Sequence, residues 1–289
     1  MEIQFERRIH FTKMTGSGND FIIIDNRDQL IDADNCRGLV SSVCRRKLSV
    51  GADGLILIEN DPEVDFKWRF FNADGGEAEM CGNGARCAAR FAYLKGIASK
   101  PSMAFRTIAG IIEAEIKNER VKIRMTPPHS LKLDFFLEAG GTKPFCLQFI
   151  NTGVPHVVHF VEDDAALDSA DVFNLGRTLR YHSHFQPAGT NVNFARVHAP
   201  HSISVRTYER GVEDETLACG TGSIAVALVA SAKGLAASPV DVKTRSGETL
   251  TIYFEKSSNH DPVDFREVYL EGDAKVVYEA ELWDETLIQ

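Results

Sequence analysis

Two short stretches decide how this chain is organised, Cys81-Gly82-Asn83-Gly84 and Cys219-Gly220-Thr221-Gly222. Each opens a segment of small and apolar residues that closes on a Lys-Gly pair. The distance from the cysteine to the closing glycine is 15 residues in both copies, from 81 to 96 and from 219 to 234. Alanines fall in register too: Ala89 and Ala92 with Ala227 and Ala230. The repeat suggests a duplicated element and a chemistry that uses two equivalent thiols.

Both segments are predicted to be helices. Residues 83–95 are rich in good helix formers, and residues 223–233 are apolar on every side, as in a helix enclosed by protein. Gly96 and Gly234 are natural helix terminators. Segments typical of strands precede and follow each helix. In the first half these are 21–25, 55–59, 68–71, 111–116 and 121–125; in the second half they are 157–161, 192–197, 203–208, 250–254 and 268–270.

The repeat predicts an α/β protein of two pseudo-symmetric halves. Pro127-Pro128 marks the expected joint, since paired prolines break both helices and strand ladders. The alternating segment 275–282 is one more strand, which we expect to pair back onto the first half. The predicted halves are therefore 1–128 plus 275–289, with the Cys81 helix, and 129–274, with the Cys219 helix. Corresponding residues are expected to line a cleft between them.

Composition excludes several classes of function. The chain has 289 residues, 44% of them hydrophobic and 25% charged, which suits an ordinary globular protein of one large or two smaller domains. The formal net charge of −9 gives no support for binding nucleic acid. No apolar run is long enough to cross a bilayer, and the amino-terminal residues lack the apolar core of a secretory signal. We expect a cytoplasmic protein.

Six cysteines are present, and their spacing argues against a metal site or a disulfide framework. There is no Cys-x-x-Cys pair, and the chain is long and carries no secretory signal. We therefore predict no metal site. Most of the other thiols are expected to be buried small side chains. They are Cys36, Cys44, Cys87 and Cys146.

A thiol at a helix N-terminus lies beside backbone N–H groups without intrahelical partners and at the positive end of the helix dipole, which favours the thiolate. The same N–H groups can bind a carboxylate. Two such elements facing one carbon can remove a proton from one side and deliver a proton to the other, which inverts the centre. Simple packing of Cys-Gly before a helix is the alternative. A phosphate loop is disfavoured because the Gly-Lys-Ser/Thr pattern is absent.

Several motifs, in order along nearly the whole chain, resemble those of diaminopimelate epimerases. They are Thr15-Gly16-Ser17-Gly18-Asn19-Asp20-Phe21, Gly51-Ala52-Asp53-Gly54, Phe71-Asn72-Ala73-Asp74-Gly75-Gly76-Glu77, Met80 to Cys87, Gly153-Val154-Pro155-His156, and Tyr208-Glu209-Arg210-Gly211 leading to Glu215 through Gly222. The resemblance implies two halves, each a curved and mostly antiparallel sheet wrapped round a central helix. It further implies a homodimer that needs no cofactor and interconverts LL- and meso-diaminopimelate on the route to lysine.

The resemblance also assigns roles to residues of this chain. Cys81 and Cys219 would be the two acid/bases, and His156 and Glu209 would tune the thiol pKa values. Substrate would be held by Asn19, Asn72, Gly82, Asn83, Asn191, Glu209, Arg210, Gly220 and Thr221. Other interpretations stay open: Asn19 as a turn residue, Glu209 and Arg210 as a surface pair, and His156 as a structural histidine.

Two departures from the family pattern concern residues expected to bind substrate. Val154 stands where the family commonly has asparagine, and valine cannot replace its hydrogen bonds; Asn151 or Thr152 would have to substitute. The stretch 212–215 is one residue longer than the common version, so a bulged loop is expected there.

Two competing functions remain. One is another cofactor-independent racemase or isomerase of the same fold, resembling proline racemase or the phenazine-biosynthesis isomerases. The other is a redox or binding protein that joins Cys81 to Cys219 in a reversible disulfide. A pyridoxal cofactor is a further alternative, although the two-thiol scheme does not need one.

Overall fold

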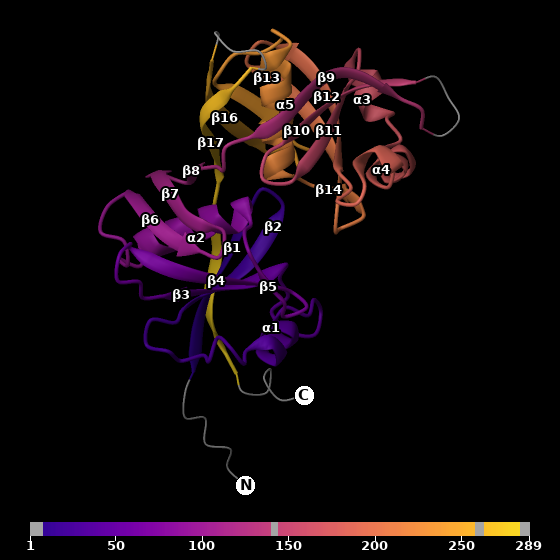
Figure 1. Ribbon diagram of the computed structural model, residues 1–289. Helices are drawn as coiled ribbons and strands as arrows, with labels where there is room; N and C mark the ends of the chain where they lie inside the picture. The colour runs from indigo at the N-terminus through magenta and orange to yellow at the C-terminus, as the bar shows by residue number, and fades with distance from the viewer. Residues whose placement is uncertain (1–7, 140–143, 258–262, 284–289) are drawn as a thin grey trace. The chain divides into compact units, whose positions relative to one another are not determined.

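A computed structural model describes residues 8–139, 144–257 and 263–283, and it divides into two compact units (Figure 1). The first holds the described residues up to Ile123 and those from Gly272 onward, and the second is Arg124–Glu271. Strands β8 (Arg120–Arg124) and β17 (Phe265–Asp273) both run across the division. The division after Ile123 lies a few residues before the prolines at 127 and 128.

The first unit is a mostly antiparallel sheet with one long helix. Its strand order is β18-β1-β2-β3-β4-β6-β7-β8, and the β2–β3 and β4–β6 pairs are parallel. Its further elements are β1 (Ile9–Gly16), β2 (Asn19–Asp25), α1 (Arg37–Val43), β3 (Gly54–Glu59), β4 (Phe66–Asn72), β5 (Glu77–Ala78), α2 (Gly82–Leu94), β6 (Ser102–Thr107), β7 (Gly110–Lys117) and β18 (Lys275–Leu282). The predicted pairing of 275–282 with the first half is confirmed, since β18 lies antiparallel to β1.

The second unit repeats this topology. Its order is β9-β10-β11-β12-β13-β15-β16-β17, with parallel pairs at the matching places, β11–β12 and β13–β15. Its further elements are β9 (His129–Leu137), β10 (Phe145–Asn151), β11 (Pro155–Phe160), α3 (Asp164–Asp168), α4 (Val172–Arg180), the short 3₁₀ helix η1 (Ser183–Phe185), β12 (Asn191–Ala199), β13 (Ser202–Glu209), β14 (Asp214–Thr216), α5 (Gly220–Ala232), β15 (Val240–Lys243) and β16 (Thr249–Lys256).

The two predicted central helices are α2 and α5, and both end in the same way. Gly96 and Gly234 adopt φ values of 66° and 74°, a left-handed conformation that glycine enters without strain. The next residue of each turn bonds back to the helix, Ile97 N–H to Ala92 and Leu235 N–H to Ala230, both at 2.8 Å. This is the Schellman cap, so the matched Lys-Gly pairs are matched helix ends.

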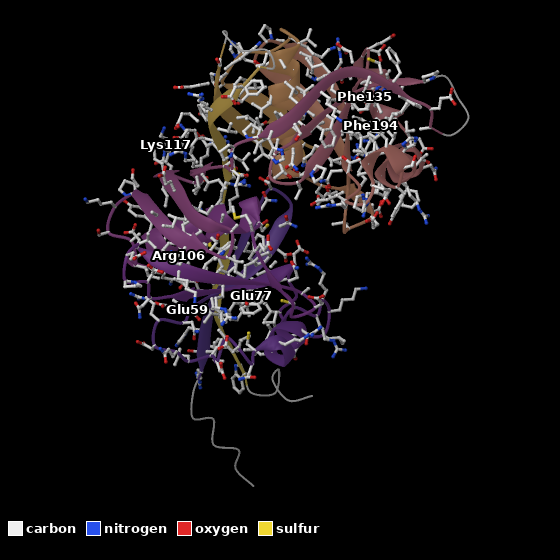
Figure 2. All side chains as sticks on the ribbon, viewed as in Figure 1. Glu59, Glu77, Arg106, Lys117, Phe135 and Phe194 are labelled. Carbon is white, nitrogen blue, oxygen red and sulfur yellow. The ribbon has the colours of Figure 1, made fainter. Side chains whose placement is uncertain are left out.

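Each sheet packs its central helix on one face and shorter helices on the other. In the first unit, Phe21, Ile56 and Trp68 touch α2 close to Gly84, whereas their neighbours Ile22 and Leu55 pack with α1. In the second unit, α5 packs on β10 to β13, while α3 and α4 cover an aromatic cluster that includes Phe194 (Figure 2). Strand side chains alternate between faces, so each strand serves both layers.

The predicted α/β class, with two similar halves built from mostly antiparallel sheet around a central helix, is therefore confirmed. Small residues make this packing possible. From Gly222 to Ser231 every residue of α5 is buried, and alanine recurs along it. A helix with such short side chains can lie close to a curved sheet.

Candidate functional site

The first half-site is the N-terminus of α2. Cys81 is the N-cap residue, with extended backbone (φ −143°, ψ 116°), and its sulfur accepts a hydrogen bond from the Gly84 N–H at 3.5 Å. Gly82, predicted to bind a carboxylate, is the first residue of the helix. A Cβ on Gly84 would come within 3.3–3.5 Å of Ile56, Trp68 and Phe21. The glycine thus lets the helix begin close against the sheet, with its thiol at the end.

A directed chain of hydrogen bonds joins this helix end to the sheet. Arg86 Nη2 donates to Asn83 Oδ1 at 2.9 Å, Asn83 Nδ2 donates to Asn19 Oδ1 at 2.8 Å, and Asn19 Nδ2 donates to Asp53 Oδ2 at 2.9 Å. Arginine can only donate and an ionised aspartate can only accept, so the two ends fix the orientation of both amides. Asn19 and Asn83 are thereby brought together, and Asn19 is more than a turn residue.

The two ends of this hydrogen-bond chain, Arg86 and Asp53, were assigned no role from the sequence. Asp53 and Arg86 lie inside the quoted motifs, and their part becomes visible only when α2, the start of β2 and the residue before β3 meet. Arg86 is fully buried and also donates to Ser17 Oγ at 2.8 Å. Asp53 is held by Arg46 Nη2 at 2.8 Å. Asn72 ends β4, opposite Gly54, so it lies at the same edge of the sheet as Asn19, and it is exposed.

The second half-site is the N-terminus of α5. Cys219 is its N-cap residue (φ −123°, ψ 111°) and is buried, with its sulfur 3.5 Å from the Thr221 hydroxyl. Gly220 and Thr221 open the helix, as Gly82 and Asn83 open α2. The Thr152 hydroxyl donates to the Thr221 carbonyl at 3.0 Å and ties this turn to the end of β10.

Glu209, at the end of β13, is the acidic partner of Cys219. One oxygen accepts from the Thr216 hydroxyl at 2.9 Å, and Cys219 also hydrogen-bonds to this carboxyl group. Burial raises the pKa of Glu209, and the bonds from Thr216 and Cys219 oppose that effect without cancelling it. A carboxylate with a raised pKa is a better acceptor for a thiol proton than an exposed one.

Arg210 and Asn191 form a separate group beside it. The Asn191 amide accepts from the Arg210 backbone N–H at 2.8 Å and donates to the Pro155 carbonyl at 3.0 Å, so it braces two segments of backbone. The Arg210 side chain donates to the Ala188 carbonyl at 2.9 Å. Glu209 and Arg210 thus have different partners among the described residues, which argues against a simple surface pair.

His156 lies on β11 with none of its surface exposed. Burial, aided by the nearby charge of Arg210, lowers the pKa of His156 to about 3. The imidazole is therefore neutral at physiological pH. Its ring Nδ1 is 3.2 Å from the Asn193 side-chain nitrogen, so the histidine has the hydrogen bond expected of a structural residue as well as a place near Arg210.

The two departures from the family pattern have local consequences. Thr152 is buried and bonded to Thr221 in the first turn of α5, and the Asn151 side-chain oxygen accepts from the Gly153 N–H at 3.0 Å, so both suggested substitutes for the missing asparagine already have partners in the protein. In the lengthened stretch, Glu213 has a positive φ of 61°. Its carboxylate binds Arg180 at 3.1 Å and Gly211 N–H at 3.0 Å, which anchors the expected bulge.

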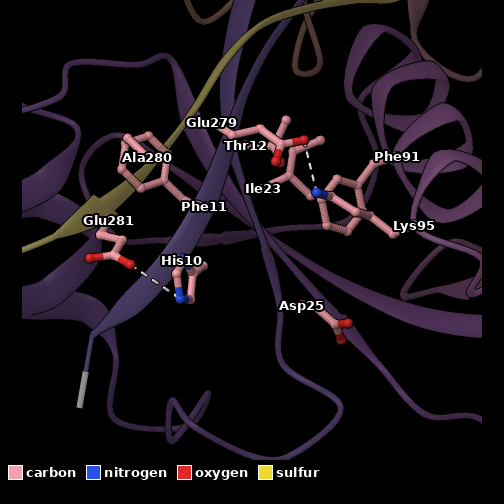
Figure 3. A pocket seen from close by; sticks show the side chains of 10 residues that line it. All are labelled: His10, Phe11, Thr12, Ile23, Asp25, Phe91, Lys95, Glu279, Ala280 and Glu281. Carbon is pink, nitrogen blue, oxygen red and sulfur yellow. Dashed lines mark hydrogen bonds and ion pairs between the residues drawn. The ribbon is translucent and has the colours of Figure 1, made fainter. Parts of the chain in front are cut away.

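A surface pocket in the first unit lies away from these groups. His10, Asp25, Lys95 and Glu279 are among the residues that line it, and Lys95 is at the far end of α2 from Cys81 (Figure 3). Thirteen residues of helix separate the two ends, about 20 Å at 1.5 Å per residue. Lys95 is paired with Glu279 at 2.8 Å, and His10 Nε2 lies 3.4 Å from Glu281, so both side chains have partners within the pocket.

No group of three or more His, Cys, Asp or Glu side chains within the described residues is arranged to hold a metal ion. None of the six cysteines forms a disulfide. In the part of the chain that the structure describes, no helix has both the length and the apolar character to span a membrane.

The buried histidine predicts a pH dependence of stability. As pH falls below 6.5 the unfolded chain binds a proton at His156 and the folded chain does not, so stability present above pH 6.5 is lost toward pH 3. Each pH unit in that window costs about 1.4 kcal/mol for this one group. Urea unfolding across the window should therefore show a shallower loss for His156→Gln than for the wild type. His10→Gln, which changes an exposed side chain, is the control; equal pH slopes for wild type and His156→Gln would contradict the assignment.

Comparison with known proteins agrees with the motifs. The family model for diaminopimelate epimerase matches residues 11–131 and 148–277. The chain is 49% identical to the diaminopimelate epimerase of Aquifex aeolicus, over 96% of this chain and 99% of that protein. It is 50% identical to that of a Hydrogenobaculum species, over 94% and 97%.

The fold has relatives at much lower identity. A phenazine biosynthesis protein of the PhzF family from Bacillus anthracis superposes with a TM-score of 0.71 at 17% identity, covering 96% of this chain and 99% of the other. At that identity the likeness shows a shared fold alone. The family match and the two full-length relatives decide the narrower assignment: the chain belongs to the diaminopimelate epimerase family.

Proposed function

We propose that this protein interconverts LL-2,6-diaminopimelate and meso-diaminopimelate by moving a proton at one α-carbon, with Cys81 and Cys219 as the two acid/bases. The observation that carries the proposal is the recurrence of a cysteine N-cap at the same place in two topologically matched units. Family membership supplies the substrate. No redox change is involved, and the reaction needs no cofactor.

The atoms balance in a simple way. A thiolate takes the α-proton as the carbon–hydrogen bond breaks, and the electron pair spreads toward the carboxylate. The thiol on the other face then gives its proton to the carbon. The product has the opposite configuration, and the two sulfurs have exchanged protonation states. The reverse reaction uses the same groups in exchanged roles.

Abstraction of the α-proton is difficult because the carbon acid is weak, and every unit of pKa mismatch costs about 1.4 kcal/mol. The carboxylate next to that carbon gains negative charge as the proton leaves. We assign its stabilisation to the N–H groups of the first turns of α2 and α5, at Gly82, Asn83, Gly220 and Thr221. Such groups are oriented before substrate arrives, so they need no reorganisation during the reaction.

The surroundings of the two sulfurs favour different resting states. Cys81 accepts an N–H bond from Gly84, which stabilises a thiolate. Cys219 bonds to the carboxyl group of Glu209, which favours a protonated sulfur donating to an acceptor. We propose that Glu209 receives the Cys219 proton when that residue must act as the base. His156, neutral and buried, is proposed to act as a hydrogen-bonding group.

The remaining predicted contacts serve the polar ends of the substrate. Asn19 and Asn72 lie at one edge of the first sheet, and Asn83 on α2 is bonded to Asn19. Their amides offer donors and acceptors, which suit an ammonium and a carboxylate. Arg210 suits a carboxylate. We assign Asn191 to holding the Arg210 backbone in place. A cytoplasmic homodimer on the route to lysine is proposed from the family resemblance.

The reaction predicts isotope exchange. Wild-type enzyme incubated with LL-diaminopimelate in heavy water should place deuterium at one α-carbon while meso-diaminopimelate accumulates, as followed by NMR and chiral chromatography. Lysine and proline should remain unlabelled. Absence of label in protein whose thiols are demonstrably reduced would reject the proposal.

The separate proton-transfer roles of Cys81 and Cys219 predict the effect of removing each thiol. Cys81→Ala and Cys219→Ala should each lower epimerisation by several orders of magnitude, because either change removes one of the two proton carriers. Cys87→Ala is the matched control: this cysteine lies on α2 and is fully buried, so it should cost about 1 kcal/mol of stability and leave turnover nearly intact. Near-normal turnover in either of the first two variants would exclude the two-thiol scheme.

The bond chain through Asn19 predicts a role for Asp53. Asp53→Asn leaves one acceptor oxygen for the donors of Asn19 and Arg46, so the Asn19 amide is no longer fixed and KM for diaminopimelate should rise about tenfold, which corresponds to about 1.4 kcal/mol, with a smaller change in kcat. Asp34→Asn removes another arginine-paired carboxylate, at an exposed position, and should leave KM unchanged. A KM within about twofold of wild type for Asp53→Asn would argue against the role.

A further inference from the structure

Three buried polar side chains form a row beneath α5. His156, Asn193 and Thr207 lie on the neighbouring strands β11, β12 and β13, with exposed fractions of 0%, 0% and 3%. Their chain neighbours Val157, Val192 and Tyr208 belong to the cluster on the opposite face of the sheet. Alternation along each strand therefore turns the polar row toward the central helix.

The orientation of the Asn193 amide is fixed by its surroundings. Its side-chain nitrogen is 2.9 Å from the Val157 carbonyl oxygen, which can only accept, so that position must be the NH₂ group. Its oxygen accepts from the Thr207 hydroxyl at 2.9 Å. A flipped amide would set two oxygens against each other at Val157 in a buried place.

This orientation decides the state of His156. The same NH₂ group is 3.2 Å from His156 Nδ1, so Nδ1 must be the acceptor of that contact. A neutral imidazole carries one proton, which is therefore on Nε2. Burial holds the ring neutral, with its pKa lowered to about 3. Asn193 thus selects one of the two tautomers of the histidine.

The proton on Nε2 has no acceptor among the described residues, although the atom is fully buried. A buried donor without a partner costs about 1–3 kcal/mol and is rare in folded proteins. Arg210 lies close enough to affect the same ring by its charge. A neutral N–H and a cation near one another suit an anionic group that arrives with the substrate or forms during the reaction.

Asn193 also touches the half-site directly. A Cβ at Gly222 would lie 2.5 Å from the Asn193 oxygen and 3.3 Å from the Cys219 sulfur. The first turn of α5 therefore lies directly on this amide, and glycine is required for that approach.

We propose that Asn193 is a positioning residue that holds His156 as the neutral Nε2–H tautomer, so that His156 enters the catalytic cycle as a hydrogen-bond donor and not as a proton acceptor. This inference rests on the proposed function for its catalytic meaning. The tautomer itself is a property of the folded chain and can be measured without substrate.

The first test is long-range proton–nitrogen NMR of intact protein labelled with ¹⁵N-histidine at neutral pH, with the His156 signals identified by their loss in His156→Gln. Wild type should show a protonated Nε2 and an unprotonated Nδ1. Asn193→Asp keeps the shape but replaces the NH₂ donor with oxygen, so Nδ1 should become protonated. An unprotonated Nε2 in wild type, or an unchanged Nε2–H state in Asn193→Asp, would overturn the inference.

Thr207→Val is the matched control. It removes the hydroxyl bond to Asn193 and leaves the Val157 carbonyl to orient the amide, so the His156 tautomer should stay as in wild type. A changed tautomer in this variant would show that the carbonyl does not fix the amide, and would overturn the reasoning.

Kinetics separates positioning from simple structural support. Asn193→Asp should lower kcat at least about tenfold with KM changed less than about twofold, since the donor acts on the reaction more than on binding. A rise in KM with unchanged kcat would contradict the role. If wild type shows the Nε2–H tautomer but does not epimerise diaminopimelate, the proposed function fails while the tautomer assignment stands. The opposite pair of results rejects only the inference.

Discussion

The structure depends on how closely the first turn of a helix of small residues can pack against a sheet. In both units the first turn contains glycines, and the approach is limited by particular atoms: Ile56, Trp68 and Phe21 at Gly84, and the Asn193 oxygen at Gly222. A Cβ at Gly222 would lie 2.5 Å from that oxygen, so a larger residue does not fit there, and a Cβ at Gly84 would lie 3.3 Å from Ile56, in tight contact. The N–H groups and dipole of the helix are thereby fixed in place, and the N-cap cysteine is held at the helix end with its extended backbone. The chemistry of the thiols follows from this packing constraint.

The same scaffold gives its two sulfurs different surroundings. Around α2 the neighbours are amides ordered between a buried arginine and an aspartate, and the sulfur accepts a backbone bond. Around α5 they are a carboxyl group with a raised pKa and a row of polar side chains that ends in a neutral histidine. The duplicated fold thus gives its two cysteines different protonation preferences. A two-base reaction needs this difference, because one sulfur must be protonated while the other is not.

Local sequence patterns were enough to predict the two central helices, the glycines that end them, the strands around them and the repeat itself. These features depend on residues close together in the chain. Strands such as β1, β6 and β10, and the helices α1, α3 and α4, were not predicted. The hydrogen-bond chain from Arg86 to Asp53 and the row of polar side chains from His156 to Thr207 were not predicted either. Each joins residues from separate segments of the sequence, which sheet topology brings together. The sequence showed that Val154 replaces the usual asparagine, but only the structure shows that Thr152 is already bonded to Thr221 on α5 and Asn151 to Gly153.

The most direct test of the account is the pH dependence of alkylation at each cysteine, quantified by peptide mass spectrometry on the folded wild-type protein. Cys146 is the internal reference, because burial and the neighbouring Asp134 raise its pKa and it is not at a helix N-terminus. The helix end and the Gly84 N–H should place the midpoint for Cys81 below the ordinary thiol value of about 8.5, and below that of Cys146. A Cys81 midpoint equal to or above that of Cys146 would contradict the claim that the helix terminus activates the thiol.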